Sequence, residues 1–282
     1  MKFGVNAWVW VSPANTEEVA KLAPKVKAMG FDWLEIPIEG MDDLDYAQGA
    51  SIIKDNGLGV SVCAAMGPDR DLIHEDESIQ QNGMAYIRHC IDAASTLGAT
   101  NIVGPIYSAV GRTWQQTPDE RARDVDLLVK NLGELAAYAN DKGTVLCIEP
   151  LNRFETSFIN LATQAVEVID RIDSPGCKIM LDSFHMNIEE KSLGAAIRQA
   201  GSRLAHFHAC ENDRGAPGSG NVQWDDVAGA LRDINYDGPV VIESFTNKVK
   251  SIARAAAIWR SFEPSQDALA KNGLTFLKQL LA

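Results

Sequence analysis

Four short stretches decide the fold of this chain: Val145-Leu-Cys-Ile-Glu149, Lys178-Ile-Met-Leu-Asp182, Leu204-Ala-His-Phe-His208 and Val240-Val-Ile-Glu243. Each is a β-like run that ends on a residue able to bind a metal ion, and their last residues are 33, 26 and 35 positions apart. One βα unit of an eight-fold barrel takes roughly 30 residues, so each interval holds one strand, one helix and their loops. The four runs therefore predict consecutive strands that deliver Glu149, Asp182, His208 and Glu243 to the same end of one barrel.

The same alternation of short β-rich runs and longer helical patterns continues along the whole chain. It predicts strands over 3–9, 32–37, 58–64, 101–105, 144–149, 178–182, 203–208 and 239–243. Helices are predicted over 16–29, 43–56, 77–97, 118–142, 160–171, 190–199, 224–233 and 247–260, followed by an amphipathic helix over 265–281. Because no linker or break in composition divides the chain, we predict a single (β/α)8 barrel domain over residues 1–282 with an additional C-terminal helix.

The composition limits the class of protein. The hydrophobic share of 46% is ample for one large core, while 26 basic against 38 acidic residues give a net charge of −12. That charge argues against a nucleic-acid partner or an anionic membrane surface. The five cysteines have no CxxC pairing, which favours buried free thiols and a reducing compartment. No leader segment or long apolar run is evident, so we expect a cytoplasmic protein.

The strand-end residues themselves predict a metal site. A single carboxylate at a strand end is more often a cap for the next helix, but four metal-competent residues in successive units are harder to explain that way. Three oxygen ligands and one imidazole favour Mn²⁺, Mg²⁺ or Co²⁺ over a structural zinc ion. The segment Glu211–Gly220 follows the strand of His208 at the same end of the barrel, so we expect it to contact a substrate.

Three runs carry a specific resemblance, and they are Ile148-Glu149-Pro150-Leu151-Asn152-Arg153-Phe154-Glu155, Leu181-Asp182-Ser183-Phe184-His185-Met186 and His206–Gly215. Together they resemble the ketose 3-epimerase family, which includes the D-tagatose and D-allulose (psicose) 3-epimerases and belongs to the xylose-isomerase-like barrels. The similarity continues through Pro217–Gly220, Trp224 and Val241–Phe245. The first half of the chain agrees with the family mainly in its βα layout.

The resemblance implies that the protein inverts C3 of a free ketohexose or ketopentose with Mn²⁺, or with Co²⁺ or Mg²⁺. It makes Glu149, Asp182, His208 and Glu243 the metal ligands, with Glu149 and Glu243 also acting as the acid–base pair. Glu155, His185 and Arg214 would hold the substrate hydroxyls and carbonyl oxygen. A C–H group next to a ketone is a very weak acid, and inversion needs a proton taken from one face and returned to the other, which two carboxylates provide. The resemblance also implies a homodimer or homotetramer.

The first strand departs from the family pattern. Asn6 would contact a substrate hydroxyl or only satisfy backbone groups, and both readings stay open. Trp114, which follows the fourth strand, is predicted either to cover the apolar face of the substrate or to pack on a neighbouring helix. His206 is expected to face away from His208 and to be structural. These departures concern the identity of the sugar rather than the chemistry.

Two other classes of activity remain as alternatives: another reaction of the same barrel superfamily, and cleavage of nucleic acid. The same ligand set would serve an aldose–ketose isomerase, an inosose dehydratase or an epimerase of a phosphorylated ketose. A phosphorylated substrate would need an anion site, and the sequence shows no basic cluster near Gly215–Gly220 beyond Arg214. A metal-dependent endonuclease of a related barrel would need additional histidines and a positively charged groove. This chain has five histidines in all and a net negative charge, which argue against that activity.

Overall fold

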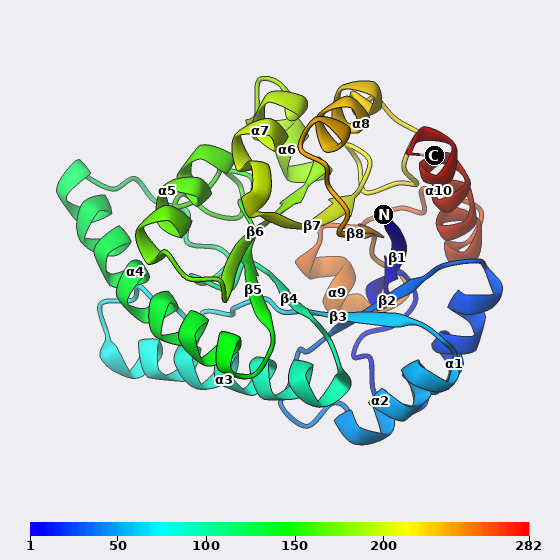
Figure 1. The fold of residues 1–282 in the computed structure, drawn as a ribbon, viewed down its shortest axis with the longest axis horizontal. Coiled ribbons are helices and arrows are strands. Elements are labelled where there is room, and N and C mark those ends of the chain that lie inside the picture. The colour runs from blue at the N-terminus through cyan, green and yellow to red at the C-terminus, as the bar shows by residue number, and fades with distance from the viewer. Residues whose placement is uncertain (282) are drawn as a thin grey trace.

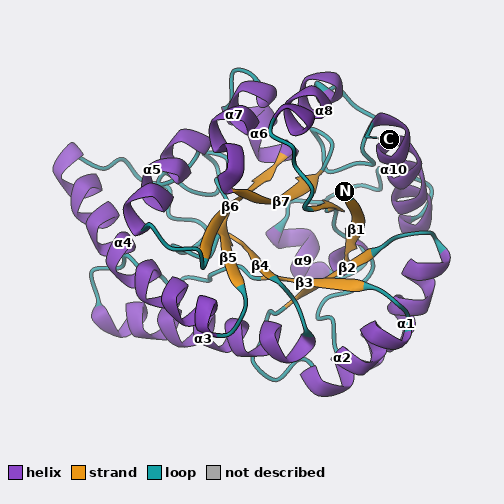
Figure 2. Cartoon of the chain, viewed as in Figure 1, coloured by secondary structure: helices purple, strands orange, loops and turns teal. Residues whose placement is uncertain are grey.

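The computed structural model describes residues 1–281. Within that range eight parallel strands close into a barrel in chain order, and helices surround it (Figures 1 and 2). The strands are β1 (Lys2–Asn6), β2 (Trp33–Pro37), β3 (Gly59–Cys63), β4 (Asn101–Gly104), β5 (Val145–Ile148), β6 (Cys177–Asp182), β7 (Leu204–Ala209) and β8 (Pro239–Ile242). The α-helices are α1 (Thr16–Ala28), α2 (Tyr46–Asp55), α3 (Glu77–Leu97), α4 (Pro118–Asp141), α5 (Ala162–Ile172), α6 (Ser183–Glu189), α7 (Leu193–Ala200), α8 (Trp224–Asp233), α9 (Lys250–Ala255) and α10 (Gln266–Leu280).

The predicted (β/α)8 barrel with its additional C-terminal helix is confirmed, and three local expectations were wrong. The first strand ends at Asn6 rather than at 9, because the Asn6 side chain caps a 3₁₀ turn, η1 (Ala7–Val9). Residues 183–189, predicted as loop, form α6, which begins where the Asp182 carboxylate accepts the Phe184 N–H. The helix predicted over 247–260 is only α9, which ends just before Ala257 in the left-handed region at φ 54°.

The strand register sets the site-bearing residues at one level. Asp182 on β6 lies opposite His208 on β7, and His208 lies opposite Val241 on β8. The amide of Glu149 donates to the carbonyl of Gly104 at the end of β4. Gly104 has a φ of 126°, and an added Cβ would lie 2.1 Å from the carbonyl oxygen of Ala64, so only glycine allows β3 and β4 to approach here. The strands therefore pack closely at their carboxyl ends, where the site-bearing residues lie.

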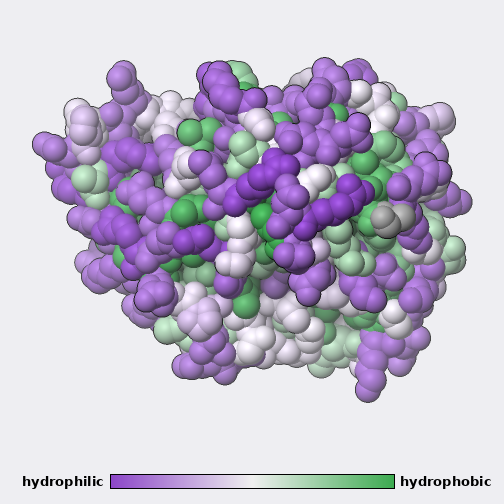
Figure 3. All heavy atoms as spheres, turned by 45° about the horizontal axis from the view of Figure 1, so that its top comes forward, coloured by the Kyte–Doolittle hydropathy of each residue, from purple (hydrophilic) through white to green (hydrophobic). Residues whose placement is uncertain are grey.

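Short α9 is seen through the ring of strands in Figure 1, and its residues Ile252 and Ala255 line a cavity at the carboxyl end of the barrel. The cysteines in the described range are all buried and free, as predicted. Among residues 1–281, no helix combines the length and apolar character needed to cross a membrane. The face drawn in Figure 3 is mostly hydrophilic with scattered apolar groups, which agrees with the charged composition.

Candidate active site

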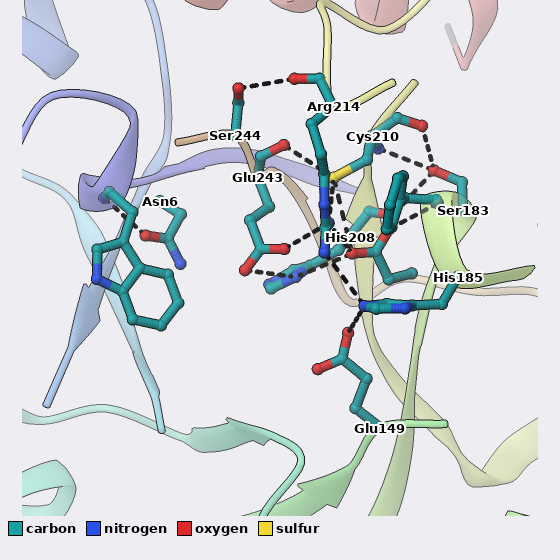
Figure 4. A network of polar contacts seen from close by, with 12 residues as sticks. Asn6, Glu149, Ser183, His185, His208, Cys210, Arg214, Glu243 and Ser244 are labelled. Atoms are coloured by element: carbon teal, nitrogen blue, oxygen red, sulfur yellow. Dashed lines mark hydrogen bonds and ion pairs between the residues drawn. The ribbon is translucent and has the colours of Figure 1, made fainter. Parts of the chain in front are cut away.

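The four strand-end residues converge at the carboxyl end of the barrel, as their spacing predicts. Atoms of Asp182, His208 and Glu243 lie within 4.8 Å of one another, and so do atoms of Glu149, Asp182 and His185. The two groups share Asp182, so they form one continuous cluster from β5 to β8 (Figure 4). Asp182 and His208 are fully buried, and Glu149 and Glu243 are each 5% exposed. Such a concentration of carboxylates needs compensating positive charge.

The donor set fits a divalent cation. Nδ1 of His208 is buried and lacks a hydrogen-bond partner within residues 1–281. It lies 3.4 Å from Oε1 of Glu243 and 4.0 Å from Oδ2 of Asp182. An unpartnered buried nitrogen beside two carboxylates is the arrangement expected of ligands that share an ion. Glu149 would complete the set from the β5 side of the cluster.

Arg214 brings positive charge into the same cluster from the loop after β7. Its Nη1 donates to Oδ2 of Asp182 at 2.5 Å and to Oε2 of Glu243 at 2.7 Å. The guanidinium lies over the ring of Phe184 at 4.0 Å and faces Phe245 at 5.1 Å. The Arg214 backbone is in the left-handed region at φ 69°, and this turn directs the side chain back into the barrel (Figure 4).

The pKa values of the carboxylates are driven apart by their surroundings. Burial, followed by the charge of Glu243, raises the pKa of Glu149 well above its ordinary value. Burial also acts to raise the pKa of Glu243, but the charges of His208 and Arg214 outweigh it and leave that pKa lowered. Burial opposes the charge on His208, yet Glu35 and Glu243 raise its pKa well above the ordinary value. A bound cation would favour the ionised form of both carboxylates and the unprotonated form of Nδ1.

His185 and Glu155 line the approach to the cluster. Nδ1 of His185 accepts the backbone N–H of Asn152 at 3.0 Å, and Nε2 lies 3.1 Å from Nη2 of Arg214 and 3.7 Å from Oε1 of Glu149. Burial, aided by Arg214, lowers the pKa of His185 to about 3, so its ring is neutral at physiological pH. Glu155 accepts from Nδ2 of the same Asn152 at 2.8 Å, and burial raises its pKa. Asn152 thus orients both side chains.

These groups open into a cavity of about 310 Å³. Its polar lining consists of Glu149, Glu155, His185, Arg214 and Glu243, and its apolar lining includes Trp8, Met66, Val110, Phe245 and Ile252. The structure therefore brings the predicted acid–base pair together with Glu155, His185 and Arg214 around one space, and Asp182 and His208 lie in the same cluster.

Two predicted contacts do not lie in this cavity. The amide of Asn6 is fully buried, donating to Glu35 and accepting the N–H of Trp8, and Asn6 is not among the residues that line the cavity. Trp114 is 53% exposed and lies over Arg112, lining a different cavity of about 600 Å³ with Gln116 and Asp124. Two residues before Trp114, Arg112 forms an isolated β-bridge with Thr156.

The orientation expected for His206 was wrong. Side chains two residues apart share a face in a strand, so His206 faces the barrel interior with His208, their rings 5.2 Å apart.

Two carboxylates were also missed. Glu35 lies between these histidines, and Glu211 accepts from Nε1 of Trp224 at 2.6 Å and from the amide of Gly218 at 2.9 Å. The signal was present for Glu35, because it interrupts an apolar run in β2.

Comparison with known proteins gives a consistent result. The family described as "Xylose isomerase-like TIM barrel" matches residues 23–280. The D-psicose 3-epimerase of Agrobacterium fabrum is 35% identical, with 100% of this chain and 99% of that protein covered. The probable ketose 3-epimerase of Synechocystis is 34% identical, with 99% of this chain and 96% of that protein covered. The crystal structure of a Methylomonas D-allulose 3-epimerase in complex with D-allulose is 29% identical, covers 99% of this chain and 96% of that chain, and has a TM-score of 0.92.

Proposed function

The chain belongs to the ketose 3-epimerase family of xylose isomerase-like TIM barrels and is an isomerase, and we propose that it inverts C3 of a free ketose with the help of a divalent cation. The observation that carries this proposal is the convergence of Glu149 and Glu243 on one cavity, with Asp182 and His208 in the same cluster. Glu149 comes from the end of β5 and Glu243 from the end of β8, so they approach a bound sugar from different strands.

In the proposed reaction each glutamate serves one face of the sugar. One carboxylate removes the C3 proton, and the other returns a proton to the opposite face, so the two exchange roles when the reaction runs backwards. Arg214 and His185 are placed to donate to the C2 oxygen, where negative charge develops in the enediolate. Glu155, held by Asn152, is placed to accept from a sugar hydroxyl.

Glu149, Asp182, His208 and Glu243 would hold the cation, and Mn²⁺ is the ion we propose, with Co²⁺ or Mg²⁺ as alternatives. When bound, such an ion supplies Lewis-acid stabilisation of negative charge on the substrate oxygens. The protein residues add the rest of the electrostatic support. Arg214 donates to Asp182 and Glu243, and the rings of Phe184 and Phe245 pack against its guanidinium.

The cavity favours an unphosphorylated sugar. Among the described residues that line the cavity, Arg214 is the one arginine or lysine. Its guanidinium is already paired with the carboxylates of Asp182 and Glu243. A phosphate would therefore meet a net negative surface. Relatives are named for psicose, L-ribulose and ketoses, so we propose a ketohexose or ketopentose of the fructose/allulose, tagatose/sorbose or ribulose/xylulose type. A phosphorylated ketose, an aldose–ketose pair or an inosose is the alternative substrate.

We further propose that residues 1–282 act as one domain in a cytoplasmic homodimer or homotetramer. Buried free cysteines suit a reducing compartment. The exposed aromatic rings of Phe154 and Trp114, which are 74% and 53% accessible, provide apolar area for contact between copies.

Proton NMR in D₂O tests the activity directly. Enzyme loaded with Mn²⁺, and enzyme stripped of metal, would be incubated with fructose, tagatose, ribulose and xylulose, and the paramagnetic ion would be removed before acquisition. We expect cation-dependent loss of the C3 proton signal together with appearance of the C3 epimer. Exchange at C1 with aldose formation would instead identify an aldose–ketose isomerase, and reaction only with ketose phosphates would reverse the substrate assignment.

A further inference from the structure

Beneath the proposed cation site, the barrel interior holds a carboxylate that the proposed reaction does not use. Glu35 on β2 is fully buried. Its Oε1 accepts from Nδ2 of Asn6 at 2.9 Å and contacts Nε2 of His208 at 2.7 Å. Its Oε2 accepts from the hydroxyl of Ser61 at 2.7 Å. Nε2 of His206 lies 2.9 Å from the same oxygen but lacks hydrogen-bond alignment within the described chain.

The position of Glu35 is costly and so calls for a physical reason. An ionised carboxylate in a dry interior loses its hydration, and a well-packed apolar side chain at the same place is often no less stable. Here the Glu35 carboxylate contacts two residues, His208 and Asn6, that lead to different parts of the site. Through His208 it reaches the proposed ligands on β6 and β8, and through Asn6 it reaches Trp8, which lines the cavity.

The contact with His208 fixes which ring nitrogen can act as a ligand. An ionised carboxylate only accepts hydrogen bonds, so Nε2 of His208 carries a proton that it donates to Glu35. The other nitrogen, Nδ1, then faces Glu243 at 3.4 Å and Asp182 at 4.0 Å. A carboxylate behind a ligating imidazole sets its tautomer and ring orientation and increases its strength as a ligand.

We propose that Glu35 is a positioning residue of the cation site: it holds His208 so that Nδ1 is aimed at Asp182 and Glu243, an inference that rests on the proposed function. Ser61 and Asn6 hold the Glu35 carboxylate in place from β3 and β1. The same contacts oppose a second cation among Glu35, His206 and His208, because both oxygens of Glu35 are already hydrogen bonded and His208 would have to bind ions through both nitrogens.

Cation affinity tests the proposal without reference to any sugar. Mn²⁺ binding would be measured by the electron paramagnetic resonance signal of free Mn²⁺ for wild type, Glu35→Leu, Glu35→Gln, Ser61→Ala and Asp71→Asn. We expect Glu35→Leu to weaken binding about 10- to 100-fold. Glu35→Gln should weaken it less, because a glutamine oxygen still accepts from Nε2. Ser61→Ala removes an anchor of Glu35 without touching His208, so it should weaken binding less than Glu35→Leu does. Asp71→Asn is the matched control, because Asp71 is a buried carboxylate that pairs with Arg112 outside the cluster, and its affinity should stay near that of wild type.

A spectroscopic readout separates positioning from mere support of the fold. In Mg²⁺-loaded protein labelled with ¹⁵N-histidine, His208 should show a protonated Nε2, and its resonance would be assigned from its absence in His208→Gln. Glu35→Leu should shift His208 toward the other tautomer, whereas Asp71→Asn should not. If Glu35→Leu fails to fold, Glu35→Gln decides the matter, and wild-type affinity in that variant overturns the proposal.

The remaining outcomes also discriminate. A folded Glu35→Leu protein that binds Mn²⁺ as tightly as wild type overturns the proposal, and so does a stoichiometry of two ions per chain that falls to one in Glu35→Leu. Tight Mn²⁺ binding without epimerisation of any ketose would instead refute the proposed function and leave the role of Glu35 standing.

Discussion

The two sides of the cavity differ in kind. The side built from β5 to β8 presents charged and hydrogen-bonding groups, including Glu149, His185, Arg214 and Glu243. The side built from β1 to β4, together with α9, presents apolar surface such as Met66, Val110 and Ile252. Directed polar contacts fix atoms at definite positions, whereas an apolar wall fixes only shape and volume. We therefore expect the polar side to determine the reaction and the apolar side to select among sugars.

The largest expected effect lies on the polar side. Glu149→Gln or Glu243→Gln should lower turnover by about 10²- to 10⁴-fold, because a neutral amide cannot take the C3 proton. Cation binding should weaken but persist, since the other ligands remain. Turnover would be followed by exchange of the C3 proton, and Mn²⁺ affinity would be measured in parallel.

The matched control for this pair is Glu189→Gln. Glu189 is an acidic residue that pairs with Arg153 outside the cavity, so turnover should stay near wild type. Full activity in either Glu149→Gln or Glu243→Gln would remove that glutamate from proton transfer and would place the chemistry elsewhere in the cavity.

Removing the cation tests the polar side of the cavity through the stability of the folded protein. An ion that binds only the folded state adds about 2.7 kcal/mol to the free energy of unfolding at a concentration of 100 times its Kd. We therefore expect chelation to lower the melting temperature of wild type, and the Asp182→Asn variant to show little response to added Mn²⁺. Thermal melts with and without a chelator measure both. A wild-type melting temperature that does not depend on cation would argue against a site in this cluster.

A smaller effect is expected for Trp224, which supports the polar side of the cavity without lining it. The Trp224 indole donates to the fully buried carboxylate of Glu211 at 2.6 Å, and Glu211 begins the loop that carries Arg214. Trp224→Phe should cost about 1.5–3 kcal/mol of stability, the range for hydrogen bonds to charged groups, and should raise KM because Arg214 is held less firmly. Urea unfolding and steady-state kinetics measure the two effects.

Trp10→Phe is a control for this change, because Trp10 also donates to a carboxylate, that of Asp267, but on the half-buried outer surface near α10. It should lose less stability and leave KM unchanged. An equal rise of KM in both variants would mean that general loosening of the barrel, rather than the Glu211 loop, affects the site.

The difference between the two sides also explains what could be predicted from the sequence. Glu149, Asp182, His208 and Glu243 end successive strands, and the barrel register alone brings them together. Glu35 was missed although it interrupts the apolar run of β2, because that local signal does not identify its partner, and His208 lies 173 positions away.

For a related reason the sequence left Trp114 open between covering the substrate and packing on a helix, and the structure places its ring over Arg112, outside the cavity that Glu149 and Glu243 line. A tryptophan near the carboxyl end of a strand suits a sugar platform, but the path of its loop is set by pairing with the segment around Thr156. Loop direction depends on such tertiary pairing, and the apolar wall was consequently the least predictable part of the site. Met66 and Val110, which form it, have no distinctive sequence signature.

The smallest expected effect lies on the apolar side and tests the comparison most directly. Val110 lies in the loop after β4, where its amide donates to the carbonyl of Met66, and its side chain lines the cavity away from the proposed ligands. Val110→Ala widens that wall by two methyl groups. A methylene in a closed pocket discriminates by 10-fold or more, so in this open cavity we expect a change of about 10-fold or less. The kcat/KM ratio of ketohexose to ketopentose should rise, because the longer sugar gains room while the shorter one loses contact.

Val125→Ala, in the core on α4, is the control and should lower stability without changing the ratio. Mn²⁺ affinity should equal that of wild type in both, and a loss of affinity in Val110→Ala would show that the two sides of the cavity are mechanically coupled rather than separate in function.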